Sequence, residues 1–423
     1  MMLCYGGIKL VIKNFYWSCL LCFLLICNSA AATSLIPDIK TSIVDLYFIN
    51  GYEYKKPSGT CKTSACQALL NEINSAQKSI SFAIYGIANQ PEIFNALINA
   101  QKRGVIVRGV TDMTENNTNY YSDTELLMQQ LGTIKTDFDI ADKNVKEFKN
   151  KFAITSAIMH NKFFVFDEKK VWTGSCNISS TGTGGYNTNT VLVINSPSIA
   201  KLYTEEFNQM YNLQFHTIKQ PIQKNTNIKI SDDAIVSVYF LPKHKVFKTD
   251  LHNLLTNAQK SIYVEMFYLT NRGIVDDLIA AKLRGVDVKV IIDATSAKNR
   301  YSGHKRLREA GIPVKTENWG GKMHSKAATI DEKYYVLGSM NWTGKAELHN
   351  DENLVILNSS TIATKTKEHF FELWNVIPDK YLTYDPAPEG PASKGSCFDG
   401  IDNDYDDYVD MEDYGCSWYK NKK

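Results

Sequence analysis

Two stretches of the chain repeat one pattern of residues that could do chemistry. His160 and Lys162 are followed by Asp167, and His324 and Lys326 are followed by Asp331 at the same spacing. A Gly-Ser-x-Asn segment follows each, so the first copy adds Ser175 and Asn177, and the second copy adds Ser339 and Asn341. The step from His to Asn is 17 residues in both copies, from 160 to 177 and from 324 to 341. A pattern duplicated at fixed spacing is far more specific than a lone short motif.

The spacing explains how these side chains could meet. Residues two apart on a strand project from the same face, so each His and its Lys would lie side by side. Asp167 and Asp331 fall where a turn is expected, and we interpret them as structural. The chain then returns as a second strand, which would bring its Ser and Asn beside the His and Lys. Serine and asparagine can donate hydrogen bonds to an oxyanion, and lysine supplies positive charge.

One copy alone offers one imidazole, whereas displacement at phosphorus needs two. One imidazole attacks and becomes a phosphohistidine, while the other protonates the leaving oxygen. Two lysines and two asparagines would hold the charged oxygens. We therefore predict a single site shared by two halves, cleaving a phosphodiester with no catalytic metal or other cofactor.

The repeat extends beyond the motifs. Residues 75–80 resemble residues 257–262, and the apolar runs that follow near-copies of Arg-Gly-Val end at Asp112 and Asp293. Helix-like and strand-like segments alternate, which predicts an α/β fold of two similar lobes, each a mixed sheet flanked by helices, related by a pseudo-twofold axis. We place the lobes at 40–220 and 232–382, a Pro- and Gly-rich linker at 385–396, and an acidic tail at 397–416.

The paired motif resembles that of the phospholipase D superfamily over roughly residues 40 to 380. The resemblance implies two lobes with the active site at their interface. It implies His160 and His324 as the catalytic pair and phosphate binding by the motif lysines and asparagines. We also expect Ser175 and Ser339 to contact the phosphate and to support this network. Members often carry a carboxylate about a dozen residues beyond the motif Asn. Glu352 matches it in the second half, and Asn189 takes its place in the first.

This asymmetry suggests different roles for the two histidines. We expect Glu352 to lie beside His324 and raise its pKa, which suits an acid. With only Asn189 nearby, His160 would stay neutral, which suits a nucleophile.

The N-terminus and the cysteines indicate a secreted protein. Residues 1–32 combine basic residues, a short apolar run and small residues at its end, which is typical of a signal peptide. We expect a secreted or periplasmic protein. Cys61 with Cys66, and Cys397 with Cys416, could then form disulfides, and we interpret Cys176 as a small packed residue.

The tail carries acidic residues at alternate positions, followed by one further on. Asp402, Asp404, Asp406 and Asp410 offer the hard oxygen ligands that calcium prefers. A non-catalytic calcium site and a disordered acidic tail closed by a disulfide both remain open readings.

Composition bears on the substrate. The formal charge of +2 gives no strong global attraction to a polyanion. A basic run at 298–308 could contact a phosphate backbone or simply form a solvated helix face. The first hypothesis is a secreted phospholipase D that converts phospholipid to phosphatidic acid. A secreted endonuclease is the alternative, and a phosphatidyltransferase of the cardiolipin synthase type is less favoured, because no membrane anchor would remain after signal removal. No obligate protein partner is expected.

Overall fold

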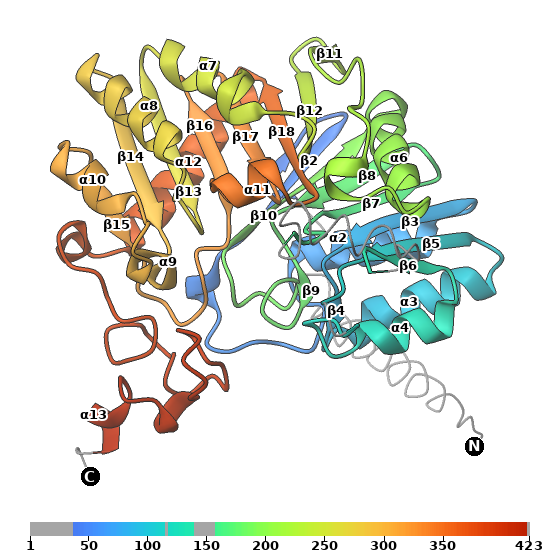
Figure 1. Cartoon of the computed structure of the whole chain (residues 1–423), viewed down its shortest axis with the longest axis horizontal. Coiled ribbons are helices and arrows are strands. Elements are labelled where there is room, and N and C mark those ends of the chain that lie inside the picture. The colour runs from blue at the N-terminus through green and yellow to red at the C-terminus, as the bar shows by residue number, and fades with distance from the viewer. Residues whose placement is uncertain (1–36, 115–116, 139–156, 421–423) are drawn as a thin grey trace, which may run out of the picture. The chain divides into compact units, whose positions relative to one another are not determined.

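The structure, a computed structural model, describes residues 37–114, 117–138 and 157–420 (Figure 1). The predicted signal peptide lies outside the described residues. Among the described helices, none has the length and hydrophobicity needed to cross a membrane.

The first lobe is built on an eight-stranded sheet with helices on both faces. Its strands are β1 (Ile39–Lys40), β2 (Val44–Ile49), β3 (Ser79–Ile84), β5 (Ile106–Thr111), β6 (Ile134–Thr136), β7 (Lys162–Phe166), β8 (Lys170–Gly174) and β10 (Asn189–Asn195). Its helices are α2 (Ser64–Ser75), α3 (Pro91–Lys102), α4 (Thr124–Leu131) and α6 (Pro197–Tyr211), and a small separate sheet pairs β4 (Ile87–Ala88) with β9 (Ile178–Ser179).

The second lobe repeats this plan. Its strands are β11 (Ile228–Lys229), β12 (Ile235–Leu241), β13 (Ser261–Met266), β14 (Asp287–Ile292), β15 (Val314–Thr316), β16 (Lys326–Ile330), β17 (Tyr334–Gly338) and β18 (Glu352–Asn358). Its helices are α7 (Asp250–Asn257), α8 (Arg272–Leu283), α9 (Ala294–Lys298), α10 (His304–Glu309), α11 (Gly344–Leu348) and α12 (Ser360–Val376). The remaining short helices are η1 (Gly51–Glu53), η3 (His216–Ile218), η4 (Val246–Lys248), η5 (Asp379–Leu382), η6 (Asp410–Glu412) and α13 (Ser417–Lys420).

The two sheets have the same strand order. It is β1-β2-β10-β8-β7-β3-β5-β6 in the first lobe and β11-β12-β18-β17-β16-β13-β14-β15 in the second. In each sheet the last three strands run parallel and the other pairs are antiparallel. Two similar lobes with mixed sheets were the prediction, and the structure confirms it.

The lobes share a hydrophobic core. It combines Phe163, Leu192 and Tyr203 of the first lobe with Val238 and Val355 of the second, all essentially buried. Separate cores lie on the outer faces, beneath α2 and α3 in one lobe and beneath α7 and α8 in the other. The inner faces therefore form one continuous apolar layer, which fixes one lobe against the other.

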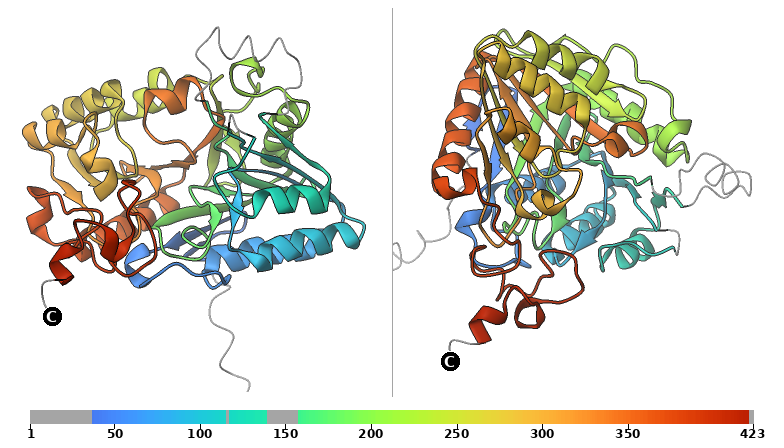
Figure 2. Two further views of the ribbon diagram at one scale, coloured as in Figure 1. Left: turned by 60° about the horizontal axis from the view of Figure 1, so that its bottom comes forward. Right: turned by 60° about the vertical axis from the view of Figure 1, so that its left-hand side comes forward.

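The segment predicted as a linker is packed rather than free. Asp385 forms ion pairs with His304 at 3.0 Å and Arg308 at 2.8 Å, and Glu389 is 1% exposed. Its Pro and Gly content reflects tight turns against the second lobe. Figure 2 shows the tail (residues 397–416), in red, lying along one end of this lobe.

Candidate active site

Each motif sits on a β-hairpin at the seam between the lobes. β7 and β16 begin at Lys162 and Lys326, two residues after the motif histidines. The turn after each strand has two residues with positive φ, for example 50° at Asp167 and 56° at Glu168, as a tight hairpin turn requires. At the end of the returning strand, an added Cβ on Gly174 would lie 2.2 Å from the Thr190 carbonyl oxygen. The motif glycine is therefore needed for close approach of the neighbouring strand.

Main-chain hydrogen bonds cross the seam reciprocally. The amide of His160 donates to the carbonyl oxygen of Asp351, and that of His324 donates to Thr188, each at 2.9 Å. Because Thr188 and Asp351 are equivalent in the repeat, the two contacts are related by the pseudo-twofold axis.

Each histidine is oriented by the opposite lobe. His160 Nδ1 lies 2.9 and 2.8 Å from the two carboxylate oxygens of Glu352. His324 Nδ1 lies 2.9 Å from Asn189 Oδ1. Both acceptors leave the proton on Nδ1, so Nε2 of each ring keeps its lone pair.

The expected pairing of Glu352 with His324 is therefore wrong. Glu352 belongs to the second half of the chain but contacts His160, because β18 begins at the seam and points across it. Asn189 crosses in the same way to His324.

The motif serines support these partners. Ser175 donates to Asn189 Oδ1 at 2.9 Å, and Ser339 donates to Glu352 Oε2 at 2.6 Å. Both serines are almost fully buried, at 2% and 0% exposure. Their hydroxyl protons are thus already used in hydrogen bonds. The expected direct contact of these serines with the phosphate is therefore wrong, and the expected supporting role agrees with the geometry.

The motif lysines are buried beside the histidines. Lys162 Nζ donates to the His160 carbonyl oxygen at 2.8 Å, and Lys326 Nζ to that of His324 at 2.6 Å. Burial lowers the pKa of Lys162 to about 8 and lowers that of Lys326 well below its ordinary value. A phosphate oxygen would relieve this clustering of positive charge.

The histidines respond to burial as well. Burial and the neighbouring lysines lower the pKa of His160 to about 4, although Glu352 opposes the shift. Burial and the neighbouring lysines lower the pKa of His324 well below its ordinary value. Both rings are neutral at pH 7 before an anion binds.

The motif asparagines differ in their engagement. Asn177 lines the pocket, and its buried Oδ1 has no hydrogen-bond partner among the described residues. Asn341 Oδ1 accepts the amide of Tyr268 at 3.3 Å. Because this oxygen can only accept a hydrogen bond, Nδ2 is the group of Asn177 that would donate to a phosphate oxygen.

The motif aspartates lie at the far ends of the hairpins. Asp167 accepts the amides of residues 77–79, with a shortest distance of 2.7 Å to Lys78, and Asp331 accepts those of residues 259–261 in the same manner. They hold the hairpin turns to the start of β3 and β13.

The two histidines open into one pocket of about 890 Å³ between the lobes and the tail. Aromatic rings form much of its wall. Tyr85 lies edge-on to His160 with ring centroids 5.5 Å apart, and its repeat equivalent Phe267 lies 5.2 Å from His324. Cys176 is buried and unpaired, and burial raises the pKa of its thiol, so it is no nucleophile.

Sequence reasoning missed a buried carboxyl pair in each lobe. Asp112 accepts the Met159 amide at 2.8 Å, and Asp293 accepts the Met323 amide at 3.0 Å, just before each histidine. Burial and Asp137 raise the pKa of Asp112 to about 8, and burial and Asp293 raise that of Glu317 well above normal. The position of Asp112 and Asp293 at equivalent strand ends was the available signal.

A buried ionic network also escaped notice. Asp351, next to Glu352, lies 2.9 Å from His216 and 2.6 Å from Lys219. Burial alone would lower the pKa of His216, but the carboxylates of Asp351 and Asp137 raise it to about 9. His216, which lies outside both motifs, is thus a buried cation that holds the strand carrying Glu352.

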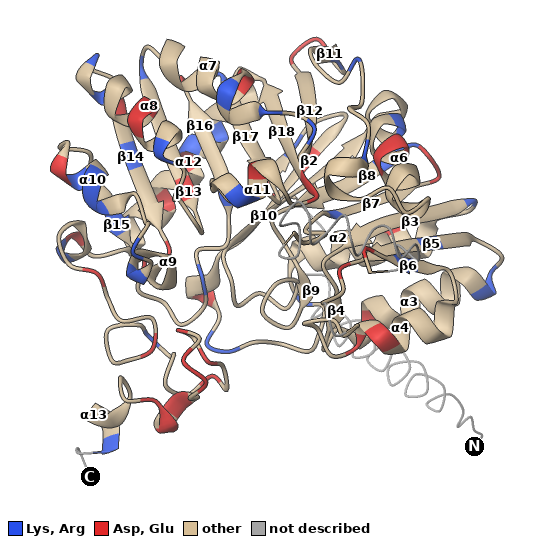
Figure 3. Cartoon of the chain, in the orientation of Figure 1, with Lys and Arg blue, Asp and Glu red and all other residues tan. Residues whose placement is uncertain are grey.

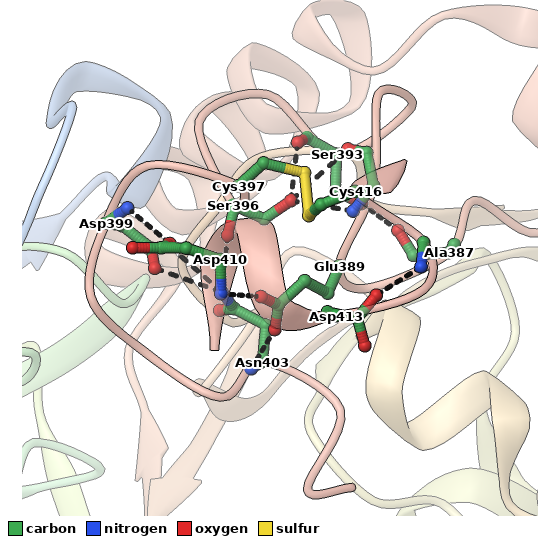
Figure 4. The surroundings of a disulfide bond; sticks show 12 residues. Ala387, Glu389, Ser393, Ser396, Cys397, Asp399, Asn403, Asp410, Asp413 and Cys416 are labelled. Carbon is green, nitrogen blue, oxygen red and sulfur yellow. Dashed lines mark hydrogen bonds between the residues drawn. A yellow bond between two sulfur atoms is a disulfide. The ribbon is translucent and has the colours of Figure 1, made fainter. Parts of the chain in front are cut away.

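The predicted calcium ligands do not form one group. Asp402 and Asp404 lie near Glu389, and Asp404 and Asp406 lie near Asp413. Asp410 is separate, because its carboxylate accepts the amides of residues 399 and 400 (Figure 4). Calcium binding stays a prediction, without Asp410. The disulfides 61–66 and 397–416 are both present.

Comparisons with known proteins agree with this geometry. A family model described as "Cardiolipin synthase, PLD-like domain" matches residues 69–211 and 251–374, one segment in each lobe. A phospholipase D of Rickettsia felis is 29% identical over 168 residues, which is 40% of this chain and 82% of that protein. The crystal structure of Nuc, a phospholipase D family member from Salmonella typhimurium, is 32% identical with a TM-score of 0.32, covering 34% of this chain and 97% of that one. Phosphatidylserine synthase of Haemophilus influenzae shares the fold, with a TM-score of 0.55 at 13% identity, covering 81% of this chain and 92% of that one.

Two α/β lobes with one histidine pair at their seam define a class of phosphodiester-processing enzymes. The chain belongs to the phospholipase D superfamily of phosphodiesterases.

Proposed function

We propose that the protein is a secreted phospholipase D that hydrolyses phospholipid to phosphatidic acid. The observation that carries the proposal is the pair of histidines in one pocket, each fixed through Nδ1 by the opposite lobe. The resemblance to phospholipases D supports a lipid substrate, and the N-terminal signal-like sequence supports secretion.

In the first step, His160 Nε2 attacks phosphorus and the bond from phosphorus to the head-group oxygen breaks. His324 donates its Nε2 proton to that oxygen, so the head group leaves as an alcohol. The substrate's negative charge raises the low pKa of His324 and so delivers it protonated. Glu352 stabilises the positive ring of the phosphohistidine, as a carboxylate does for an imidazolium.

In the second step, His324 removes a proton from water, and the water oxygen attacks phosphorus. The P–N bond breaks, phosphatidic acid leaves and His160 is restored. Lys162, Lys326 and Asn177 hold the non-bridging oxygens, with Asn341 in the equivalent position.

The test uses mature protein with phosphatidylcholine in mixed micelles, with supercoiled plasmid and with bis(p-nitrophenyl) phosphate. We expect choline release from the lipid to exceed plasmid nicking. Faster nicking with no choline release would favour the endonuclease alternative. If the protein showed none of the three activities, the proposal of phosphodiesterase activity would be rejected.

A further inference from the structure

The tail forms part of the catalytic pocket. Asp399 to Asn403, Tyr405 and Asp407 line the same cavity as His160 and His324. A disulfide between Cys397 and Cys416 closes the segment, and Figure 4 shows the hydrogen bonds around it. The sequence offered no sign that this segment reaches the site.

Several contacts fix the tail in this position. Tyr186 of the first lobe donates to the Asp399 carboxylate. In the second lobe, Thr295 donates to the Asn403 carbonyl oxygen at 2.8 Å, and Lys298 pairs with Asp404 at 2.6 Å. The tail therefore bridges both lobes at the pocket mouth.

Tyr405 lines this mouth and contacts a lysine of the second lobe. Its ring centroid lies 4.1 Å from Lys322 Nζ, two residues before His324. Tyr85 of the first lobe and Tyr268 of the second line the same cavity as Tyr405. The ring therefore belongs to a pocket whose walls come from both lobes.

The loop is built to hold Tyr405 there. Tyr405 has a φ of 62°, a left-handed conformation that costs energy for a tyrosine. The Asp402 carboxylate accepts the amides of Tyr405 at 2.6 Å and Asp407 at 2.9 Å, which stabilises the turn. Such strain at a pocket mouth suggests that the position of the ring matters for function.

The tail also brings negative charge to the mouth. Asp402 and Asp407 line the pocket, and Figure 3 shows the tail as a concentration of acidic residues. A nucleic-acid duplex carries one negative charge per about 1.7 Å of its axis. Phosphates on either side of the reacting one would meet these carboxylates, whereas a phospholipid brings a single phosphate.

We propose that the tail is the specificity wall of the catalytic pocket, with Tyr405 and Asp407 as specificity-determining residues that admit phospholipid and exclude nucleic acid. This inference rests on the proposed function of the same site. Lys322 holds the ring in place through its ammonium group.

The test compares Tyr405→Ala, Asp407→Asn and the double variant with wild type on three substrates. We expect the double variant to raise plasmid nicking about tenfold relative to choline release from phosphatidylcholine micelles. Hydrolysis of bis(p-nitrophenyl) phosphate, a small diester, is measured in parallel to report the chemical step separately from selectivity. Tyr408→Ala is the matched control, because Tyr408 is a tail tyrosine of similar exposure, 56% against 53% for Tyr405, that does not line the pocket.

Tyr405→Phe keeps the ring and should keep the selectivity. An unchanged ratio of plasmid to lipid cleavage in the double variant would disprove the proposed role of the tail in selectivity. Equal gains in rate on both substrates would disprove it as well. Wild type that hydrolyses the small diester but not phosphatidylcholine would instead refute the lipid function. Near-equal melting temperatures exclude misfolding as the cause.

Discussion

In the first lobe, strand β10 begins with Asn189; in the second, β18 begins with Glu352, and each of these residues serves the histidine of the other lobe. Strand order, hairpin turns, lysine contacts and supporting serines are the same on both sides. One anionic side chain in place of a neutral amide is thus the main chemical difference at the histidines. A symmetric scaffold can give two identical side chains different tasks by changing one of their partners.

The difference favours His160 as nucleophile, although for another reason than the sequence suggested. A carboxylate beside His160 stabilises positive charge on the ring once phosphorus is attached. The neutral Asn189 leaves protonated His324 less stabilised, which makes it the stronger acid.

Removing either histidine should have the largest effect. His160→Ala and His324→Ala should each lower kcat/KM by roughly 10⁴-fold or more, because the two rings act as a unit. Hydrolysis of phosphatidylcholine and of bis(p-nitrophenyl) phosphate measures this loss. Near-wild-type activity in either variant would disprove a shared site.

Exchanging the histidine partners sharpens the comparison. Glu352→Gln should slow turnover roughly 100-fold for all leaving groups, because the positive charge on the phosphorylated His160 ring is no longer stabilised by a carboxylate. Asn189→Asp should raise the pKa of His324 and slow only substrates with poor leaving groups, by about tenfold. A series of phosphodiesters with leaving groups of different pKa measures both.

Mass mapping of trapped intermediate should find the phosphoryl group on His160. An adduct on His324, or leaving-group sensitivity in Glu352→Gln but not in Asn189→Asp, would reverse the roles.

The lysines should set the alkaline limit of activity. The pKa of Lys162 is lowered to about 8, so its ammonium is present below that pH and lost above it. Since kcat/KM reports ionisations of the free enzyme, it should decline above about pH 8. In the double variant Lys162→Arg with Lys326→Arg, the decline should move to higher pH at a lower plateau, because arginine stays charged. If the decline of kcat/KM stayed at the same pH in this variant, the decline would have to come from another group.

Metal removal should have the smallest effect. Turnover should be unchanged in EDTA, because lysines neutralise the phosphate charge. Calcium should instead raise the melting temperature slightly, through the tail carboxylates, and Asp404→Asn should weaken that rise. Loss of turnover on chelation would point to a metal at the site.

The sequence was sufficient for the lobes and the motif residues, because the same pattern occurs twice and each copy checks the other. It could not identify the partner of each histidine. Glu352 lies 28 residues beyond His324, from 324 to 352, and nothing local tells that its strand points across the seam. The partner depends on how two sheets pack, which is a property of the assembled lobes.

The position of the tail and the buried ionic network could not be predicted from the sequence for similar reasons. Tyr405 is near the histidines only because Asn403 and Asp404 dock on the second lobe. His216 has no motif around it in the sequence, and its partners Asp137 and Asp351 come from both lobes. Pairwise contacts between distant segments leave no periodic pattern to detect.

The reciprocal main-chain bonds at His160 and His324 limit how the enzyme can move. A hinge that opened the lobes would break the backbone pairing that positions both imidazoles, along with the shared apolar layer. The substrate therefore enters a cleft whose two sides stay fixed during turnover. Motions that admit lipid and release product are confined to the rim of the cleft, and amide exchange should be slowest at the histidines.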